Sequence, residues 1–318
     1  MDSALNLVVN CAARKRASGS LLSLGSLDAS AFQTRFDRWT ALLCNQEGNR
    51  IPATDLYCGD YWSVVRRCAS AHPHQVSLFI ASAGYGLVHS SEKLQPYSAT
   101  FSRGLVDSIS QKSIPSATNW QWWNSLCTWR RDQDKNPYSL ADLALREPNK
   151  PILVTLSAEY FEALFSDLLS ARNAFSDPDL LVILSAGIKN PRELKSNVLP
   201  MDARAEHTLG GARGSLNARM ALHLLEHFKP HEFRVSKLRP YLDQFLSQQP
   251  SIRSFDRSRM TDEEVISFIK SGFAATPVAS FSSLLRKLRD QGNACEYKRF
   301  RSLFHSASDS TPTTVVTA

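Results

Sequence analysis

Four short apolar runs in the first 184 residues constrain the fold of this chain most strongly. They occupy residues 5–9, 76–81, 152–156 and 180–184. Each run is rich in Val, Ile, Leu or Phe and too short for a typical helix, which is typical of buried parallel strands. Segments with helical spacing, such as 61–71 and 158–172, separate the runs. The alternation predicts an α/β fold with an open, mainly parallel sheet sandwiched by helices.

Each apolar run ends in small or polar residues. These exits are 10–13, 82–86, 157–158 and 185–187. Open α/β sheets bind ligands in the crevice outside the carboxyl ends of their strands, so the four exits predict one shared pocket. Small residues also permit tight turns from strand to helix, and this alternative stays open for any single exit.

The segment 202–219 combines acids, bases, a glycine pair and polar amides, which makes it too polar for a core. It follows the last apolar run, so we expect it to bind something beyond the carboxyl end of that strand. The stretch 210–215 lacks the Gly-Lys-Ser/Thr ending of a phosphate-binding loop, which argues against nucleotide hydrolysis. Ser215 still stands at the start of an expected helix, 216–228, where it would accept a DNA phosphate.

Composition is that of a globular protein with a sizeable core, with 43% hydrophobic and 21% charged residues among 318. The net charge of +7 favours an anionic partner such as nucleic acid. Between His231 and His305, 13 Lys and Arg stand against 8 Asp and Glu, so most of the excess lies late in the chain. The alternative is that a positive charge surplus of this size only promotes solubility.

The six cysteines are scattered without a C-x-x-C pair, and His207 has no second histidine at ligand spacing. We therefore expect reduced thiols, no metal and no cofactor. No apolar run approaches the roughly 18 residues of a membrane span, and the first residues do not form a signal peptide. These features predict a cytoplasmic protein that does not enter a membrane.

Composition changes after Lys229-Pro230 to short amphipathic helices, expected at 238–247, 261–271 and 281–289. We expect residues 1–230 to form the α/β domain, 231–305 a small basic helical module and 306–318 a disordered tail. The third helix carries Arg286, Lys287 and Arg289 and precedes another basic helix, which suggests a helix-turn-helix or winged-helix module that binds DNA.

Residues 101–150 form an expected insertion that contains four of the six tryptophans, between Trp120 and Trp129. Tryptophan beside arginine is typical of a surface on which bases stack. The alternative is a hydrophobic clasp that holds the insertion against the core.

Three motifs carry a resemblance to a bacterial family of uncharacterised function. Residues 82–100, SAGYGLVHSSEKLQPYSAT, resemble its signature SAKYGL…PY, and 11–15 and 53–59 resemble its C-S-x-x-K and A-x-x-LY-x-G segments. Gly84 stands where that family usually has Lys, and Ser98 where it has Asp.

That family resembles the uracil-DNA glycosylase-like fold. Its longer members, found in phage-defence loci, resemble antiphage DNA glycosylases that excise glucosylated hydroxymethylcytosine from phage DNA. The resemblance implies an enzyme that flips a modified base out of double-stranded DNA, hydrolyses its N-glycosidic bond and leaves an abasic site.

Such a reaction builds positive charge on the sugar and negative charge on the leaving base, so the site needs a carboxylate and hydrogen-bond donors. We expect Asp202 as the carboxylate and Asn10 as its catalytic partner. The expected base-binding residues are Cys11, Ser82, Tyr85, Gly86, Tyr97 and Asn217. The expected phosphate-binding residues are Arg14, Lys15, Arg204, Arg213, Ser215, Arg286, Lys287 and Arg289.

Alternatives remain at this point. Asp202 between two arginines also fits a structural ion-pair network, while His89 and Glu92 are further candidates for acid or base. A non-catalytic reader of modified DNA or nucleotides would use the same pocket and module. A hydrolase or transferase of free nucleosides would have little need for the basic helices.

Overall fold

A computed structural model of the chain describes residues 4–16, 22–27, 31–45, 50–111, 118–131, 137–188, 190–251, 256–276 and 279–309. The chain divides into two compact units, residues 1–251 and 252–318. Among the described residues, no helix has both the length and the apolar character needed to cross a membrane.

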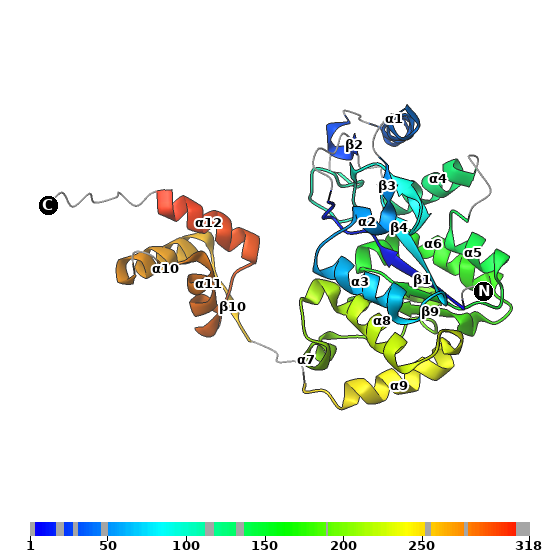
Figure 1. The fold of residues 1–318 in the computed structure, drawn as a ribbon. Coiled ribbons are helices and arrows are strands. Elements are labelled where there is room, and N and C mark those ends of the chain that lie inside the picture. The colour runs from blue at the N-terminus through cyan, green and yellow to red at the C-terminus, as the bar shows by residue number, and fades with distance from the viewer. Residues whose placement is uncertain are drawn as a thin grey trace. The chain divides into compact units, whose positions relative to one another are not determined.

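The first unit is built on a five-stranded sheet with the order β5-β4-β1-β8-β9 (Figure 1). Its strands are β1 (Leu5–Asn10), β4 (Val76–Ser82), β5 (Gly86–His89), β8 (Ile152–Thr155) and β9 (Leu181–Leu184). All pairs are parallel except β4 with β5. The four apolar runs thus form the four parallel strands, which confirms the predicted α/β class and its mainly parallel sheet.

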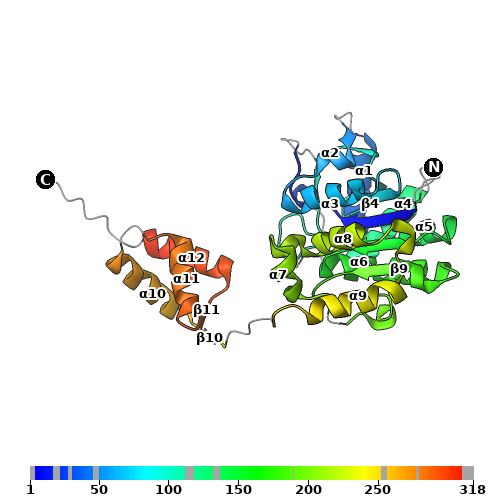
Figure 2. The same ribbon diagram turned by 60° about the horizontal axis from the view of Figure 1, so that its bottom comes forward.

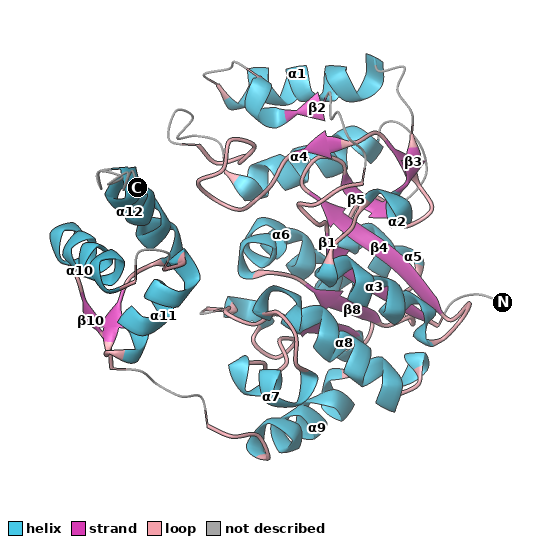
Figure 3. Ribbon diagram, turned by 60° about the vertical axis from the view of Figure 1, so that its left-hand side comes forward, coloured by secondary structure: helices cyan, strands magenta, loops and turns pink. Residues whose placement is uncertain are grey.

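Helices pack on both faces of this sheet (Figures 2 and 3). They include α3 (Asp60–Ala71), α4 (Asn119–Arg131), α5 (Leu140–Arg146), α6 (Ala158–Ala174) and α8 (Leu216–His227). The path from β1 through α3 to β4 runs one way across the sheet, and the path from β8 through α6 to β9 runs the other way. Right-handed crossovers in opposite directions place α3 and α6 on opposite faces. Helix α8 packs beside α3, while α4 and α5 pack on α6.

This reversal makes the gap between β1 and β8 the topological switch point of the sheet. In open α/β sheets, the loops that leave the two carboxyl ends at such a point turn toward opposite faces, and ligands bind in the crevice between them. The fold therefore selects one place along the sheet edge for a ligand.

Further elements of the first unit lie outside the sheet. They are β2 (Leu22–Ser23), α1 (Phe32–Asn45), β3 (Ile51–Pro52), α2 (Ala53–Leu56), β6 (Lys93–Leu94), β7 (Tyr97–Ser98) and α7 (Glu206–Leu209). Strand β2 pairs with β7, and β3 pairs with β6.

Helix α9 (Val235–Ser247) belongs to the first unit, although the sequence placed a domain boundary after residue 230. Leu238, Leu242 and Leu246 are buried in the first core. The hydroxyl of Tyr241 lies 2.8 Å from Nε2 of His223 on α8. The apolar stripe of α9 completes the layer that covers the sheet, so the boundary falls after Ser251.

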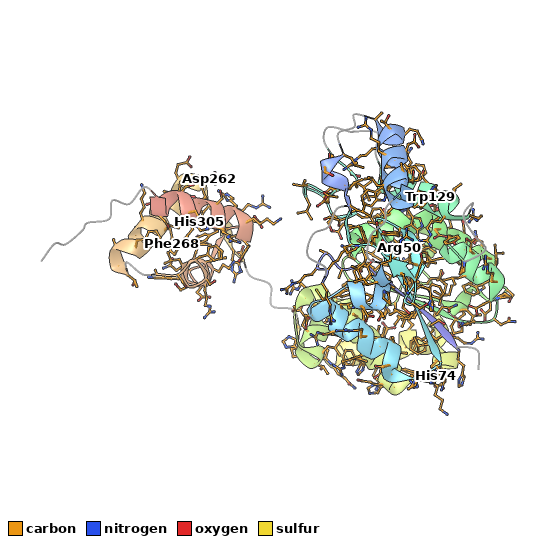
Figure 4. The ribbon with its side chains drawn as sticks, turned by 45° about the horizontal axis from the view of Figure 1, so that its top comes forward. Arg50, His74, Trp129, Asp262, Phe268 and His305 are labelled. Carbon is orange, nitrogen blue, oxygen red and sulfur yellow. The ribbon has the colours of Figure 1, made fainter. Side chains whose placement is uncertain are left out.

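The second unit contains three helices and one two-stranded parallel pair among its described residues. Its elements are β10 (Ser258–Arg259), α10 (Asp262–Ala275), α11 (Phe281–Asp290), β11 (Asn293–Ala294) and α12 (Tyr297–Asp309). Val265, Leu288 and Phe300 lie in its separate core, and Phe268, labelled in Figure 4, packs against that core. Residues 306–309 belong to α12 and not to the expected tail, while 310–318 lie outside the described residues.

The described part of the tryptophan-containing insertion packs against the core, as the clasp alternative predicted. Trp122 and Trp123 are buried, and their indole N–H groups donate to the Ala83 carbonyl at 2.8 Å and to Asp167 at 3.0 Å. Trp120, by contrast, is 50% exposed. The insertion is therefore anchored by its two central indoles.

Asp167 is the structural anchor that we expect to matter most for stability. Its buried carboxylate also accepts from the backbone N–H groups of Leu140 and Ala141, at 2.9 and 3.0 Å. Replacing it with Ala leaves three donors unpaired and should lower the free energy of unfolding by about 3 kcal/mol, measured by urea denaturation. Glu162→Gln breaks only an exposed ion pair with Arg192, so this control should change the free energy of unfolding by less than about 0.5 kcal/mol. Equal effects of the two substitutions would contradict this role.

Candidate active site

Asn10 bridges the two strand ends at the switch point. Its Oδ1 accepts a hydrogen bond from the backbone N–H of Ser157 at 3.2 Å, across the gap from β1 to β8. Its Nδ2 donates to the carbonyl of Cys11 at 3.1 Å, and its own carbonyl accepts from the Tyr61 hydroxyl at 3.2 Å. The amide is half-buried and held in one orientation.

The first turn of α6 brings two further functional groups to this crevice. The Tyr160 hydroxyl lies 3.0 Å from Sγ of Cys11, and both side chains are buried. The exposed Glu159 accepts from the Ser157 hydroxyl at 2.8 Å. Ser157 is also the N-cap of α6, so the residues that start the helix place a carboxylate beside the end of β1.

A chain of buried hydroxyl groups continues from the crevice toward β4. Ser82 Oγ lies 2.6 Å from the Tyr97 hydroxyl, which lies 2.9 Å from the Tyr57 hydroxyl. Burial raises the pKa of both tyrosines well above their ordinary value, so the two phenols stay protonated. Ser82 Oγ accepts in turn from the N–H groups of Gly84 and Tyr85 at 3.2 and 3.0 Å.

Lys15 covers this hydroxyl chain. Its Nζ lies 4.2 Å from the centre of the Tyr97 ring and 5.7 Å from that of Tyr57. Nζ donates to the Ala12 carbonyl at 3.3 Å. Burial lowers the pKa of the Lys15 ammonium below its ordinary value because the charged form loses solvation.

Asp107 fixes the loops on the far side of Lys15. Its carboxylate accepts from the hydroxyls of Ser23 and Ser98, at 2.6 and 2.7 Å, and from the N–H of Gly25 at 2.9 Å. Burial opposes its charge, but the hydrogen bonds from Ser23 and Ser98 outweigh that effect and lower the pKa of Asp107. A carboxylate therefore lies next to Ser98, where the family signature has Asp.

Gly84 allows the close approach of Tyr97. A Cβ at this position would lie 2.5 Å from Cδ2 of Tyr97, too close for any side chain unless the ring moves. Gly86, two residues later, has a φ of 76°, which favours glycine. The loop after β4 is thus shaped to hold the Tyr97 ring against Ser82.

The structure does not bring Asp202 between two free arginines. Its carboxylate pairs with Arg204, with Nε to Oδ1 at 3.0 Å and Nη2 to Oδ2 at 2.8 Å. Hydrogen bonding from Arg204 lowers the pKa of Asp202, and the same guanidinium donates to the Leu246 carbonyl at 3.1 Å. Arg213 pairs instead with Glu206, at 2.5 Å. These contacts match the ion-pair alternative for the segment.

Ser215 is buried and not open to a phosphate group, which its expected role requires. It is 1% exposed, and its hydroxyl donates to Asp60 of α3 at 2.7 Å. Arg219 contacts the same carboxylate at 2.8 Å. The start of α8 is thus tied to the start of α3, and the Ser215 hydroxyl does not face solvent.

Asn217 holds two strand exits together. Its Oδ1 accepts from the Ala186 N–H at 2.9 Å, and its Nδ2 donates to the Leu156 carbonyl at 2.7 Å. The side chain therefore spaces the ends of β8 and β9, beside the crevice, through contacts with backbone groups.

Tyr85 packs edge-on against Tyr97, with the ring centres 5.1 Å apart, and Tyr97 is only 1% exposed. Tyr85 lines a groove of about 470 Å³ together with Arg50, Trp129 and Arg130. Arg50 and Trp129 are labelled in Figure 4. The two tyrosines that were expected to stack on a base are therefore in contact with each other, and Tyr97 offers no open face in this conformation.

His89 and Glu92 also lie away from the switch point. His89 lines a groove of about 680 Å³ formed by the amino half of β4 with His74 and Lys150. Glu92 pairs with Arg130 at 2.5 Å. His89 therefore belongs to a separate groove, and Glu92 serves in a structural ion pair.

The remaining expected cations are on the surface. Arg14 is exposed next to Lys15, and Arg286 and Lys287 are exposed on α11 of the second unit. Arg289 is half-buried, and its guanidinium reaches the Cys295 carbonyl at 3.4 Å. The described residues contain no group of three or more His, Cys, Asp or Glu placed to hold a metal ion.

Sequence reasoning missed several residues of the crevice. The pattern Ser-Ala-Glu-Tyr at 157–160, directly after an apolar run, could have indicated Glu159 and Tyr160. Tyr57 lay inside a recognised motif but received no role. Asp107 carries no local signal, because its partners come from separate segments of the chain.

Residues 43–112 match the model of a family of unknown function, DUF6884. No curated protein matches the chain. The matched span includes Tyr57, Ser82, Tyr97 and Asp107, while Lys15 and the residues of the β1 and β8 exits lie outside it. The family match therefore covers Asp107 and the hydroxyl groups of Tyr57, Tyr97 and Ser82, but not the ends of β1 and β8.

The spacing of Gly84 and Tyr97 gives a direct test of this geometry. Gly84→Ala should lower the free energy of unfolding by about 1–3 kcal/mol, because the new methyl group must displace the Tyr97 ring. Gly214→Ala is the matched control, since a Cβ there meets nothing within 4 Å. Thermal melts of both variants supply the measurement, and a Gly84→Ala protein as stable as the control would contradict the packing described.

Proposed function

We propose that this chain is a DNA glycosylase that hydrolyses the N-glycosidic bond of a modified base in phage DNA and leaves an abasic site. The observation that carries the proposal is the set of fixed polar groups at the β1/β8 switch point, where Asn10, Ser157 and Glu159 form a hydrogen-bonded series. The first unit would adopt a uracil-DNA glycosylase-like arrangement, and the enzyme would act in the cytoplasm on incoming phage DNA.

The groups at the crevice suit the charges of the reaction. The exposed Glu159 carboxylate would stabilise the cationic sugar or activate water, as hydrolysis of the bond requires. The held amide of Asn10 and the Lys15 ammonium would stabilise the anionic leaving base. Glucosylated hydroxymethylcytosine is our proposed substrate, on the resemblance to antiphage glycosylases.

An apolar loop supports recognition of duplex DNA. Leu105 and Val106 are 47% and 75% exposed, and Arg103 is exposed beside them. Asp107 ties the base of this loop to two serines, so the apolar tip is presented rigidly. Apolar side chains of this kind insert between base steps, and a flanking arginine suits the phosphates.

The second unit supplies a candidate DNA-binding surface of helix-turn-helix or winged-helix type. Four cationic side chains on α11 and α12 are exposed, namely Arg286, Lys287, Lys298 and Arg301. Arg299, in contrast, pairs with Asp262 at 2.5 Å. The exposed cations would bind phosphates without reading sequence.

The decisive experiment compares two carboxylates. Glu159→Gln should lower the rate of base release by about 100-fold or more, because the amide cannot supply the negative charge. Asp202→Asn should reduce it by less than about 10-fold, since that carboxylate already neutralises Arg204. The measurement is base release from glucosylated phage DNA, followed by mass spectrometry and by cleavage with an abasic-site endonuclease.

The opposite result would identify the carboxylate differently. If Asp202→Asn loses activity while its melting temperature is unchanged and Glu159→Gln stays active, Asp202 is the catalytic carboxylate that the sequence predicted. Unmodified and hydroxymethylated DNA serve as substrate controls. Tight binding without base release from any of the three DNAs would favour the non-catalytic reader.

A second prediction concerns the basic helices. Arg286→Ala combined with Lys287→Ala should weaken DNA binding and reduce the slope of log affinity against log salt by about 0.9 for each phosphate that is no longer neutralised. Arg299→Ala removes a cation that is already paired and should change the slope little. Fluorescence anisotropy at several salt concentrations measures both, and identical slopes in all proteins would exclude this surface.

A further inference from the structure

Lys15 has an unusual environment for a lysine. Within the described ranges its Nζ forms one hydrogen bond, the 3.3 Å contact with the Ala12 carbonyl, and no ion pair. A lysine ammonium group has three donors, and Lys15 is half-buried with no carboxylate in hydrogen-bonding contact. The amine is instead held against the faces of two tyrosine rings, 4.2 and 5.7 Å from their centres.

The neighbouring acid does not neutralise Lys15 by contact. The charge of Asp107 favours the ammonium form of Lys15, yet the oxygens of Asp107 accept hydrogen bonds from Ser23, Ser98 and Gly25. Loss of solvation lowers the pKa of Lys15, which increases the fraction of neutral amine. A partly buried, unpaired amine beside a crevice is the environment in which lysines act as nucleophiles.

We propose that Lys15 captures the abasic-site aldehyde as a Schiff base. This inference rests on the proposed function, because base excision produces a sugar whose open form carries an aldehyde at C1′. Lys15 Nζ packs on Tyr97, whose hydroxyl lies 2.6 Å from Ser82 at the end of β4, the strand that pairs with β1. The aldehyde would therefore form beside these two strand ends. The amine would thus hold the product on the enzyme until it is released by hydrolysis.

The step balances without an additional reagent. The lone pair of neutral Lys15 Nζ forms a bond to C1′, while the C=O π electrons move to oxygen, which takes up a proton. The nitrogen of the carbinolamine then passes one of its protons to the hydroxyl, which leaves as water, and the nitrogen lone pair forms the C=N bond of the protonated imine. Hydrolysis of the imine reverses these changes and regenerates the amine. The chain of hydroxyls from Tyr57 through Tyr97 to Ser82 offers groups that both donate and accept protons nearby.

The test uses duplex DNA with a preformed abasic site and sodium borohydride, which reduces an imine to a stable amine. The full-length protein should give a covalent protein–DNA complex on a denaturing gel, and peptide mapping should place the adduct on Lys15. Lys15→Met and Lys15→Arg should each reduce the complex by at least about 10-fold, because neither side chain offers a nucleophilic amine. Lys195→Met removes an exposed surface lysine and should leave the yield unchanged.

No trapped complex with the wild-type protein, or mapping of the adduct to other lysines, would overturn the inference. The mapping requires no variant, so a Lys15 substitution that fails to fold does not leave the question open. Because the abasic site is supplied ready-made, the result is independent of base release. Adduct formation without base release from modified DNA would refute the glycosylase alone, while base release without an adduct would refute only the role of Lys15.

Discussion

The candidate site depends on the reversal of chain direction between β1 and β8. Two right-handed crossovers that run in opposite directions leave a crevice at this point of the sheet edge. Asn10 closes the base of that crevice with a hydrogen bond to Ser157, which also caps α6. The bridge therefore couples the end of one strand, the start of one helix and the position of Glu159.

Burial of polar groups is the second constraint. Ser82, Tyr57 and Tyr97 lie in the core, where a hydroxyl group without a hydrogen bond would destabilise the fold. Their hydroxyl groups therefore form hydrogen bonds with one another, from Tyr57 to Tyr97 to Ser82. Gly84 is required because any side chain there would displace Tyr97. Packing and hydrogen bonding thus fix the two tyrosine rings against which Lys15 lies. The ammonium group has no carboxylate in contact, and the faces of these rings stabilise it instead.

The segment 202–219 shows that polarity alone does not distinguish a binding site from a structural network. Its acids and bases pair with one another or with α3, and its amide Asn217 spaces two strand exits. The segment is polar because its side chains form hydrogen bonds with backbone N–H and C=O groups at the ends of strands and helices. Buried loops need such polar side chains just as binding sites do. Tyr85 and Tyr97 are equally instructive, since their rings pack edge to face, 5.1 Å between centres, and yet only Tyr85 lines a groove while Tyr97 is buried.

By itself the sequence determined the α/β class, the four parallel strands and most helices, because apolar periodicity and cap residues act locally. It also indicated that polar strand exits such as Asn10 and Cys11 share an edge. The tertiary structure alone decided which exits meet, since strand order is a long-range property. It also decided that α9 belongs to the first unit, that Asp202 is paired, and that Tyr160 meets Cys11 while Lys15 covers Tyr97. Those outcomes depend on contacts between residues distant in the chain, such as the 3.0 Å approach of Cys11 and Tyr160, and no local pattern records them.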